Sequence, residues 1–158
     1  KRDVDDIVNL IHANLIGPIF CCKAFGPTMI DQGYGKIINI ASVAALVARD
    51  RDIYDQNSKN QQPVDYAASK AGLLGLTRDL AGLLSPQGVL VNAISPGGFD
   101  KGDCSEGFIK DYSKITMLGH MGRMNQDLKG AALFLASAAS DYVTGQNIIV
   151  DGGFSIWK

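Results

Sequence analysis

The stretch Asp65-Tyr66-Ala67-Ala68-Ser69-Lys70-Ala71-Gly72 places a phenol and an ammonium four residues apart at the start of a helix with an apolar stripe. Residues i and i+4 share one face of an α-helix, so the Lys70 charge can lie beside the Tyr66 hydroxyl and favour its ionised form. A tyrosine ordinarily titrates at about pH 10, so a site that removes a proton from an alcohol needs such a neighbour. A tyrosine and a lysine on a solvated helix face fit the same spacing, and this stretch alone leaves both interpretations open.

A long amphipathic helix is predicted over residues 4–30, because apolar side chains recur there at three- and four-residue steps. Within it, Pro18 has no N–H to donate to the carbonyl four residues back, which is that of Asn14. The helix should therefore kink and leave the Asn14 oxygen for a water or a side chain. An ordinary kink, closed by a water with no further role, is an equal alternative.

Short apolar runs between the helices indicate parallel strands that are covered on both faces. The order helix, strand, helix, strand, helix, strand predicts an α/β fold with a doubly wound parallel sheet, Rossmann-like in type. The predicted strands are 36–42, 89–94 and 146–150, and the later helices are 65–84 and 126–138, the last with Asn125 as its cap.

Ser42 ends the first predicted strand, at the edge of the sheet where open α/β proteins bind ligands. A serine that caps a loop would occupy the same position. The polar connection 43–63 that follows fits a substrate-facing segment and a solvated surface loop equally well. Residues 99–123 have no clean period and contain four glycines, so we predict a lid over the mouth of the sheet that contributes nothing to the core.

The composition fits one domain of ordinary size. The 158 residues carry a net charge of −1 without a basic stripe, which argues against nucleic acid and membrane surfaces as partners. No stretch is expected to reach the length of a membrane span, although 46% of the residues are hydrophobic. The cysteines Cys21, Cys22 and Cys104 are odd in number, and two are adjacent in an apolar run. This pattern suits reduced core thiols in a cytoplasmic protein better than disulfides or a metal site.

In chain order, these motifs resemble the short-chain dehydrogenase/reductase family. Each motif is weak by itself, but all occur in the family's order, and the resemblance extends over nearly the whole chain. The stretches that carry it are the helical Asn motif Asn14-Leu15-Ile16-Gly17, the serine strand 35–42, the signature 66–70, the Pro-Gly turn 92–97, and the final strand with its flanks, 142–146 and 150–153.

The resemblance implies hydride transfer between a nicotinamide cofactor and an alcohol or carbonyl, with four catalytic residues. Tyr66 would be the general acid or base, and Lys70 would stabilise its phenolate. Ser42 would orient the substrate oxygen by a hydrogen bond. The freed carbonyl of Asn14 would hold a water that links Lys70 to solvent as a proton relay.

The resemblance also implies a set of cofactor contacts and partners. NAD or NADP would contact Tyr66 and Lys70, with Lys70 on the nicotinamide ribose, and the turn at Pro96, Gly97 and Phe99 would flank the nicotinamide. The substrate would be a small molecule. The protein would act as a homo-oligomer, a dimer or a tetramer.

The sequence departs from the family pattern in several places. No Gly-rich fingerprint follows an opening strand, so we expect a single partial domain, the C-terminal catalytic half without the N-terminal half that binds the dinucleotide phosphates. Ser42 and Tyr66 are 24 positions apart, against about a dozen in the family, and the threonine common after the Pro-Gly turn is missing from 99–102. The long insert and the C-terminal end look similar to a branch that acts on sugars and sugar acids, including flagellin-modification oxidoreductases.

Two other functional classes stay open at this point. One is an inactive remnant that serves as an oligomerisation module without cofactor binding. The other is a dehydratase or epimerase on the same scaffold, which would hold its cofactor tightly with no net change in absorbance.

Overall fold

A computed structural model of the chain describes residues 2–157, and three parallel strands form its centre. The strands are β1 (Gly35–Ile40), β2 (Val89–Pro96) and β5 (Asn147–Val150), in the order β1-β2-β5. Gly35 pairs with Val89 and Ala93 with Asn147, so all three carboxyl ends meet at one edge of the sheet. The predicted α/β fold with a parallel sheet is confirmed.

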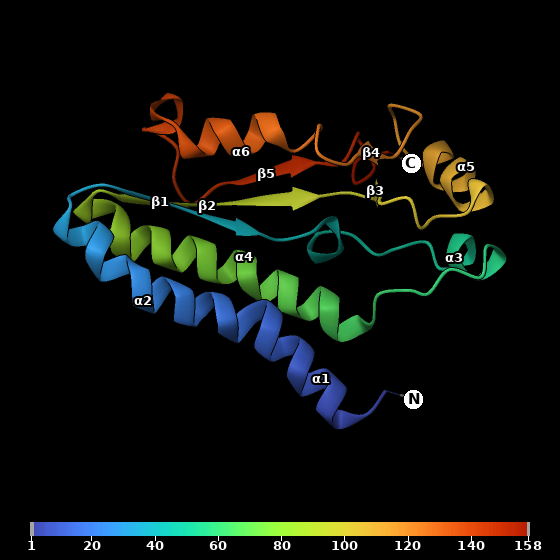
Figure 1. Cartoon of the computed structure of the whole chain (residues 1–158), viewed down its shortest axis with the longest axis horizontal. Helices are drawn as coiled ribbons and strands as arrows, with labels where there is room; N and C mark the ends of the chain where they lie inside the picture. The colour runs from blue at the N-terminus through green and yellow to red at the C-terminus, as the bar shows by residue number, and fades with distance from the viewer. Residues whose placement is uncertain (1, 158) are drawn as a thin grey trace.

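Helices cover both faces of this sheet (Figure 1). The long N-terminal helix and α4 lie on one face, and α6 lies on the other. The long helix consists of α1 (Val4–Ile11), a π-helical turn (His12–Ile16) and α2 (Gly17–Asp31), while α4 is Val64–Leu84 and α6 is Lys129–Ala136. The shorter elements are the 3-10 turns Val43–Ala45, Ser85–Gln87 and Ala138–Ser140, the helices α3 (Asp52–Gln56) and α5 (Glu106–Lys114), and the paired strands β3 (Phe99–Asp100) and β4 (Gly122–Arg123).

The core forms around β2, which is buried along almost its whole length. Val89, Val91 and Ala93 are fully buried, as expected for a central strand covered on both faces. Leu73 and Leu84 of α4 also belong to the core of the protein. The helix α4, which carries Tyr66 and Lys70, is therefore fixed to the sheet, and a precise site requires such support.

The prediction that residues 99–123 contribute nothing to the core is wrong. Ser105 caps α5 by accepting a hydrogen bond from the Phe108 amide, and α5 then buries Phe108 and Tyr112. These side chains pack with Ile53 of α3 and with Met121 in a second hydrophobic cluster. The cluster fixes the segment beside the carboxyl end of the sheet.

The predicted cap of the last helix is also wrong. Asn125 has φ +58° and lies in a turn, and α6 begins at Lys129 without a side-chain cap. Asp127 instead accepts hydrogen bonds from the backbone amide and the guanidinium of Arg123. The acidic side chain therefore stabilises the turn that precedes α6.

β1 is an edge strand of the described sheet, because it is bonded to β2 alone. Successive residues of a strand direct their backbone groups to opposite sides, and Gly35 and Ala41 direct theirs toward β2. The amides and carbonyls of Lys36, Ile38 and Ile40 therefore face away from β2. This edge forms one wall of a groove of about 450 Å³, and α2 forms the other.

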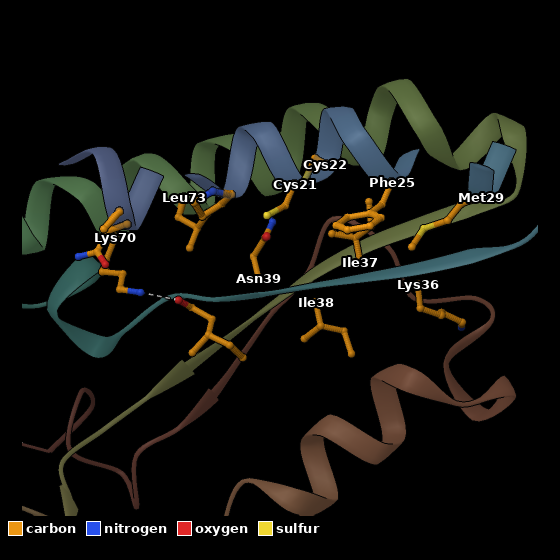
Figure 2. A pocket seen from close by; sticks show the side chains of 14 residues that line it. Cys21, Cys22, Phe25, Met29, Lys36, Ile37, Ile38, Asn39, Lys70 and Leu73 are labelled. Carbon is orange, nitrogen blue, oxygen red and sulfur yellow. Dashed lines mark hydrogen bonds between the residues drawn. The ribbon is translucent and has the colours of Figure 1, made fainter. Parts of the chain in front are cut away.

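Figure 2 shows this groove from close by, with Ile37 and Asn39 pointing from β1 toward α2. Cys21 and Phe25 of α2 are exposed, and they line the opposite wall of the groove. The expectation that the paired cysteines lie in the core is therefore wrong for Cys21. Cys22 and Cys104 are half-buried, and all three cysteines are free thiols.

The helix Val4–Asp31 is long and apolar enough to cross a membrane by length and composition, so the expectation that no stretch is that long is wrong. In the structure, the apolar residues of this helix lie on two sides. One side packs against α4, where Leu15 approaches Gly72, and the other lines the groove.

Candidate functional site

Asn14 lies in the π-helical turn His12–Ile16, one turn before Pro18. Because proline has no N–H, the Asn14 carbonyl lacks its ordinary helical partner, and the predicted interruption takes the form of a π turn. The Asn14 side-chain amide donates to the Ser69 hydroxyl of α4 at 3.3 Å. The site of the interruption is confirmed, and the role of the carbonyl as a water-holding relay stays a prediction.

Ser69 connects this π turn to the first turn of α4. Its hydroxyl is fully buried and donates to the Tyr66 carbonyl at 2.7 Å while accepting from Asn14. Three residues on, Gly72 allows a close approach, since a Cβ there would lie 2.9 Å from a Leu15 methyl carbon. The sequence places Ser69 in the signature without a role, and in the structure its hydroxyl joins the Asn14 side chain to the backbone of Tyr66.

Ser42 lies two residues beyond β1 and caps the 3-10 turn Val43–Ala45. Its Oγ accepts a hydrogen bond from the Ala44 amide at 3.2 Å. An acceptor role for the oxygen leaves the hydroxyl proton available to donate to another group. The loop-cap interpretation and the catalytic interpretation are therefore compatible in one residue.

Tyr66 and Lys70 lie one turn apart in α4, and the Lys70 ammonium is 5.7 Å from the centre of the Tyr66 ring. Lys70 donates to the Ile40 carbonyl at 2.7 Å, the bond drawn as a dashed line in Figure 2. Partial burial lowers the pKa of Lys70 from its ordinary value of 10.5. The ammonium thus lies between the end of β1 and the Tyr66 ring, and its effect on the ionisation of Tyr66 stays a prediction.

The lowered pKa makes a stability test possible. Between the folded-state pKa of Lys70 and 10.5, the unfolded chain binds more protons than the folded chain, so stability should rise with pH. In urea unfolding at about pH 7 and about pH 10, the native protein should gain stability relative to the Lys70→Met variant at the higher pH. If the native protein and the variant differ in free energy of unfolding by the same amount at both pH values, the Lys70 ammonium is not desolvated.

A small cavity of about 170 Å³ brings together residues from four separate parts of the chain. We call it the Ser42–Tyr66 cavity. The predicted site residues Ser42, Tyr66 and Gly97 all line it. Its remaining lining residues are Val43, Ala44, Arg49, Tyr54, Gln62, Gly98, Tyr112 and Phe154.

The other predicted site residues lie around this cavity without lining it. Asn14 and Lys70 line the groove beside β1, on the other side of the first turn of α4. Pro96 is the last residue of β2 and pairs with Val150. Phe99 belongs to β3 and lines a neighbouring cavity of about 280 Å³. The residues named from the sequence are therefore divided among three spaces: the Ser42–Tyr66 cavity, the cavity of Phe99, which shares Gly98 with it, and the groove along β1.

Gly97 is required by the close approach of two backbone segments. Its amide donates to the Val150 carbonyl at 3.0 Å, and a Cβ at this position would lie 2.8 Å from the Asp151 Cα. The next amide, of Gly98, donates to the Tyr112 hydroxyl at 2.8 Å. The turn after β2 is thus held on both sides, and its backbone forms one wall of the cavity.

Tyr112 and Phe154 are cavity residues that the sequence did not indicate. Their rings stack with centroids 5.1 Å apart and an interplanar angle of 4°. Burial raises the pKa of Tyr112, so its hydroxyl is a neutral group that accepts from the Gly98 amide and keeps one proton to donate. The sequence did contain a signal for this part of the cavity wall. Ser105 is a typical helix cap, and Phe108 and Tyr112, four residues apart, would lie on one face of the helix that follows it.

One cluster could supply metal ligands, although the sequence predicted no metal site. Asp100, Asp103 and Cys104 bring one ligand atom each within 4.8 Å of one another. Lys59 already provides a positive charge there, with its ammonium 3.3 Å from an Asp103 oxygen and 3.4 Å from the Cys104 sulfur. The group is therefore described as an ion-paired cluster, and we assign it no metal.

Residues 2–155 match a family model described as enoyl-(acyl carrier protein) reductase. It is 32% identical over 156 residues to the mouse 3-oxoacyl-[acyl-carrier-protein] reductase, covering 99% of this chain and 60% of the mouse protein. The chain belongs to the short-chain dehydrogenase/reductase family. It spans about 60% of the length of the curated relatives that it matches.

Solved structures of short-chain dehydrogenases share the fold closely. A family member from Leptospira borgpetersenii with bound NAD+ is 37% identical, with a TM-score of 0.91 over 99% of this chain and 59% of its own. A gluconate 5-dehydrogenase from Burkholderia cenocepacia, in complex with NADP and tartrate, is 35% identical, with a TM-score of 0.85 over 98% of this chain and 58% of its own.

The described residues fit the nicotinamide end of such a cofactor. Lys70 has three ammonium protons, and among residues 2–157 the Ile40 carbonyl is its hydrogen-bond partner, so donors are left for ribose hydroxyls. The turn at Gly97 exposes backbone beside the Ser42–Tyr66 cavity. A nicotinamide bound there would supply or accept a hydride.

Proposed function

We propose that the protein is an NAD(P)-dependent oxidoreductase that transfers a hydride between a nicotinamide cofactor and an alcohol or carbonyl substrate. The observation that carries the proposal is that Ser42, Tyr66 and the Gly97 turn line one small cavity. The relatives that contain bound NAD+ or NADP support the choice of cofactor.

The residues have separate roles in this proposal. Tyr66 donates a proton to the substrate oxygen during reduction and removes it during oxidation. Ser42 donates a hydrogen bond to the same oxygen, because its own oxygen already accepts from the Ala44 amide. Lys70 holds the ribose hydroxyls and places positive charge near Tyr66. Asn14, through its freed carbonyl, holds the water that connects Lys70 to solvent.

We propose a small polar substrate, of the sugar or sugar-acid type. The Ser42–Tyr66 cavity of about 170 Å³ is smaller than the roughly 300–1,000 Å³ usual for pockets that bury drug-sized ligands. Polar side chains make up much of its wall, among them Gln62, Tyr54 and Tyr112. The similarity to a gluconate 5-dehydrogenase supports this class, and a small molecule is a better partner for such a cavity than nucleic acid or a membrane.

A titration with NAD(H) and NADP(H) tests the function directly. Saturable binding to the native protein, with a change in nicotinamide absorbance when a polyol or hydroxy acid is added, is the expected result. Tight binding with no net absorbance change during turnover would instead indicate a dehydratase or epimerase. No binding together with stable self-association would indicate an oligomerisation module, which the open edge of β1 also favours.

We further propose a homo-oligomer, a dimer or tetramer, that works in the cytoplasm. Apolar side chains on the surface of the long helix, such as Phe20 and Phe25, are more than half exposed and could pack between copies. The three free thiols suit a reducing compartment. Light scattering coupled to size exclusion tests the assembly, and a monomer at micromolar concentration would exclude it.

A further inference from the structure

The Ser42–Tyr66 cavity contains one charged side chain whose role the reaction does not explain. Arg49 is the only charged residue among the described residues that line this cavity. It lies seven positions after Ser42, in the long connection between β1 and α4, and it is half-buried. A cation on the wall of a small polar cavity favours an anionic ligand.

The guanidinium of Arg49 has no carboxylate partner among the described residues. Within residues 2–157, no Asp or Glu oxygen lies within ion-pair distance of its guanidinium. Its hydrogen bond in the structure is a long one, 3.4 Å to the Pro63 carbonyl. A guanidinium has five N–H donors, so most of them are available to a ligand, including a pair suited to a carboxylate.

Two of the acidic residues near Arg49 in the sequence accept hydrogen bonds from groups other than its guanidinium. Asp50 accepts from the Asp52 amide at 3.0 Å, and Asp55 accepts from the Gln61 side chain at 2.8 Å. Each of these two carboxylates therefore has a hydrogen-bond donor within the loop. Arg49 lines both this cavity and a neighbouring one that it shares with Arg51, so its positive charge reaches both. Burial raises the pKa of Tyr54, and the charge of Arg49 opposes that effect.

Neutral hydrogen-bonding groups complete the wall. No described residue within hydrogen-bond distance pairs with the Tyr54 hydroxyl or the Gln62 amide, and Tyr112 keeps a proton to donate. A ligand with a carboxylate at one end and hydroxyls along its length matches this combination of groups. Its reacting carbon would lie by Ser42 and Tyr66.

We propose that Arg49 is the specificity-determining residue that binds the carboxylate of a small hydroxy acid, or of the corresponding oxo acid, in the Ser42–Tyr66 cavity. This inference rests on the proposed function and names the substrate class of the same site. The bidentate contact fixes one end of the substrate, so that the hydroxyl to be oxidised reaches Tyr66.

The test compares acids with polyols of matching skeleton, gluconate with glucitol and tartrate with threitol. Binding to the native protein is measured by calorimetry with NAD(P)H present, so that the hydroxy acids and polyols are not oxidised, and turnover with NAD(P)+ is measured from nicotinamide absorbance. We expect each acid to bind more tightly than its polyol. Arg49→Gln should weaken acid binding and raise the KM for acids about 10- to 100-fold, as expected for a charge-assisted hydrogen bond, with kcat little changed.

Two variants serve as controls. Arg49→Lys keeps the positive charge but loses the paired N–H donors of the guanidinium. It should therefore bind acids more tightly than Arg49→Gln and less tightly than the native protein. Arg51→Gln removes a neighbouring charge that does not line this cavity and should leave acid binding unchanged. In all three variants, the affinity for the polyols and for NAD(P) should stay within about twofold of the native value.

The outcomes separate this inference from the proposed function. Acids that bind no more tightly than polyols, or equal losses for acids and polyols in Arg49→Gln, would overturn the role of Arg49 even if the protein turns over. If acid binding depends on Arg49 but no hydride transfer is observed, the role of Arg49 is supported and the proposed function is wrong.

Discussion

Replacing Tyr66 by phenylalanine should lower kcat about 10²–10⁴-fold while leaving NAD(P) binding nearly unchanged. The change removes one hydroxyl, and general acid–base help from a positioned side chain is of that size. The ring stays, so its packing against the Lys70 ammonium is kept. Steady-state turnover and a fluorescence titration of the cofactor together measure the two quantities.

The matched control for this variant is Tyr142→Phe, because Tyr142 is fully exposed on the surface away from the cavity. It should keep native turnover. Ser42→Ala should fall between the two variants, because it removes a hydrogen bond to the substrate oxygen but leaves Tyr66 in place. A Tyr66→Phe protein with more than a tenth of the native kcat would exclude Tyr66 as the general acid or base.

The periodic parts of this fold could be predicted from the sequence because burial dominates their composition. The strand predicted over 89–94 and the helix predicted over 65–84 correspond to β2 and α4 with small changes at their ends. β2 continues to Pro96 because Ser95 and Pro96 pair with β5. Ser95 is buried there, and its hydroxyl donates to the Asn147 side chain at 2.8 Å. The hydrophobic pattern of a sequence does not predict which polar residues are buried, because their burial depends on a hydrogen-bond partner elsewhere in the chain.

The site could be predicted where a motif fixes local geometry, and could not where distant segments meet. Tyr66 and Lys70 share one helix, so their spacing was sufficient to pair them. Arg49 and Tyr112 come from two separate connections whose paths depend on the cluster around Phe108. No short-range signal in a polar loop states which of its charges faces a cavity.

Asn92 places a side-chain amide in the middle of β2, and this amide is paired on both sides. Its side chain donates to the Val143 carbonyl at 2.8 Å and accepts from the Gln146 amide at 3.0 Å. The side chain is 1% exposed, so water does not reach it. These two bonds hold the connection that leads into β5, whose far end places Asp151 against Gly97.

Asn92→Ala should therefore lower the free energy of unfolding by about 2–4 kcal/mol. Two hydrogen bonds are lost, the Val143 carbonyl is left without its partner, and a small void opens beside β2. Urea denaturation followed by circular dichroism measures the change. Gln146→Ala is the control, since it keeps the backbone amide that Asn92 binds and should change stability by less than about 0.5 kcal/mol. If the two variants unfold at the same urea concentration, Asn92 does not hold β5 in register, and the turn at Gly97 owes its position to another contact.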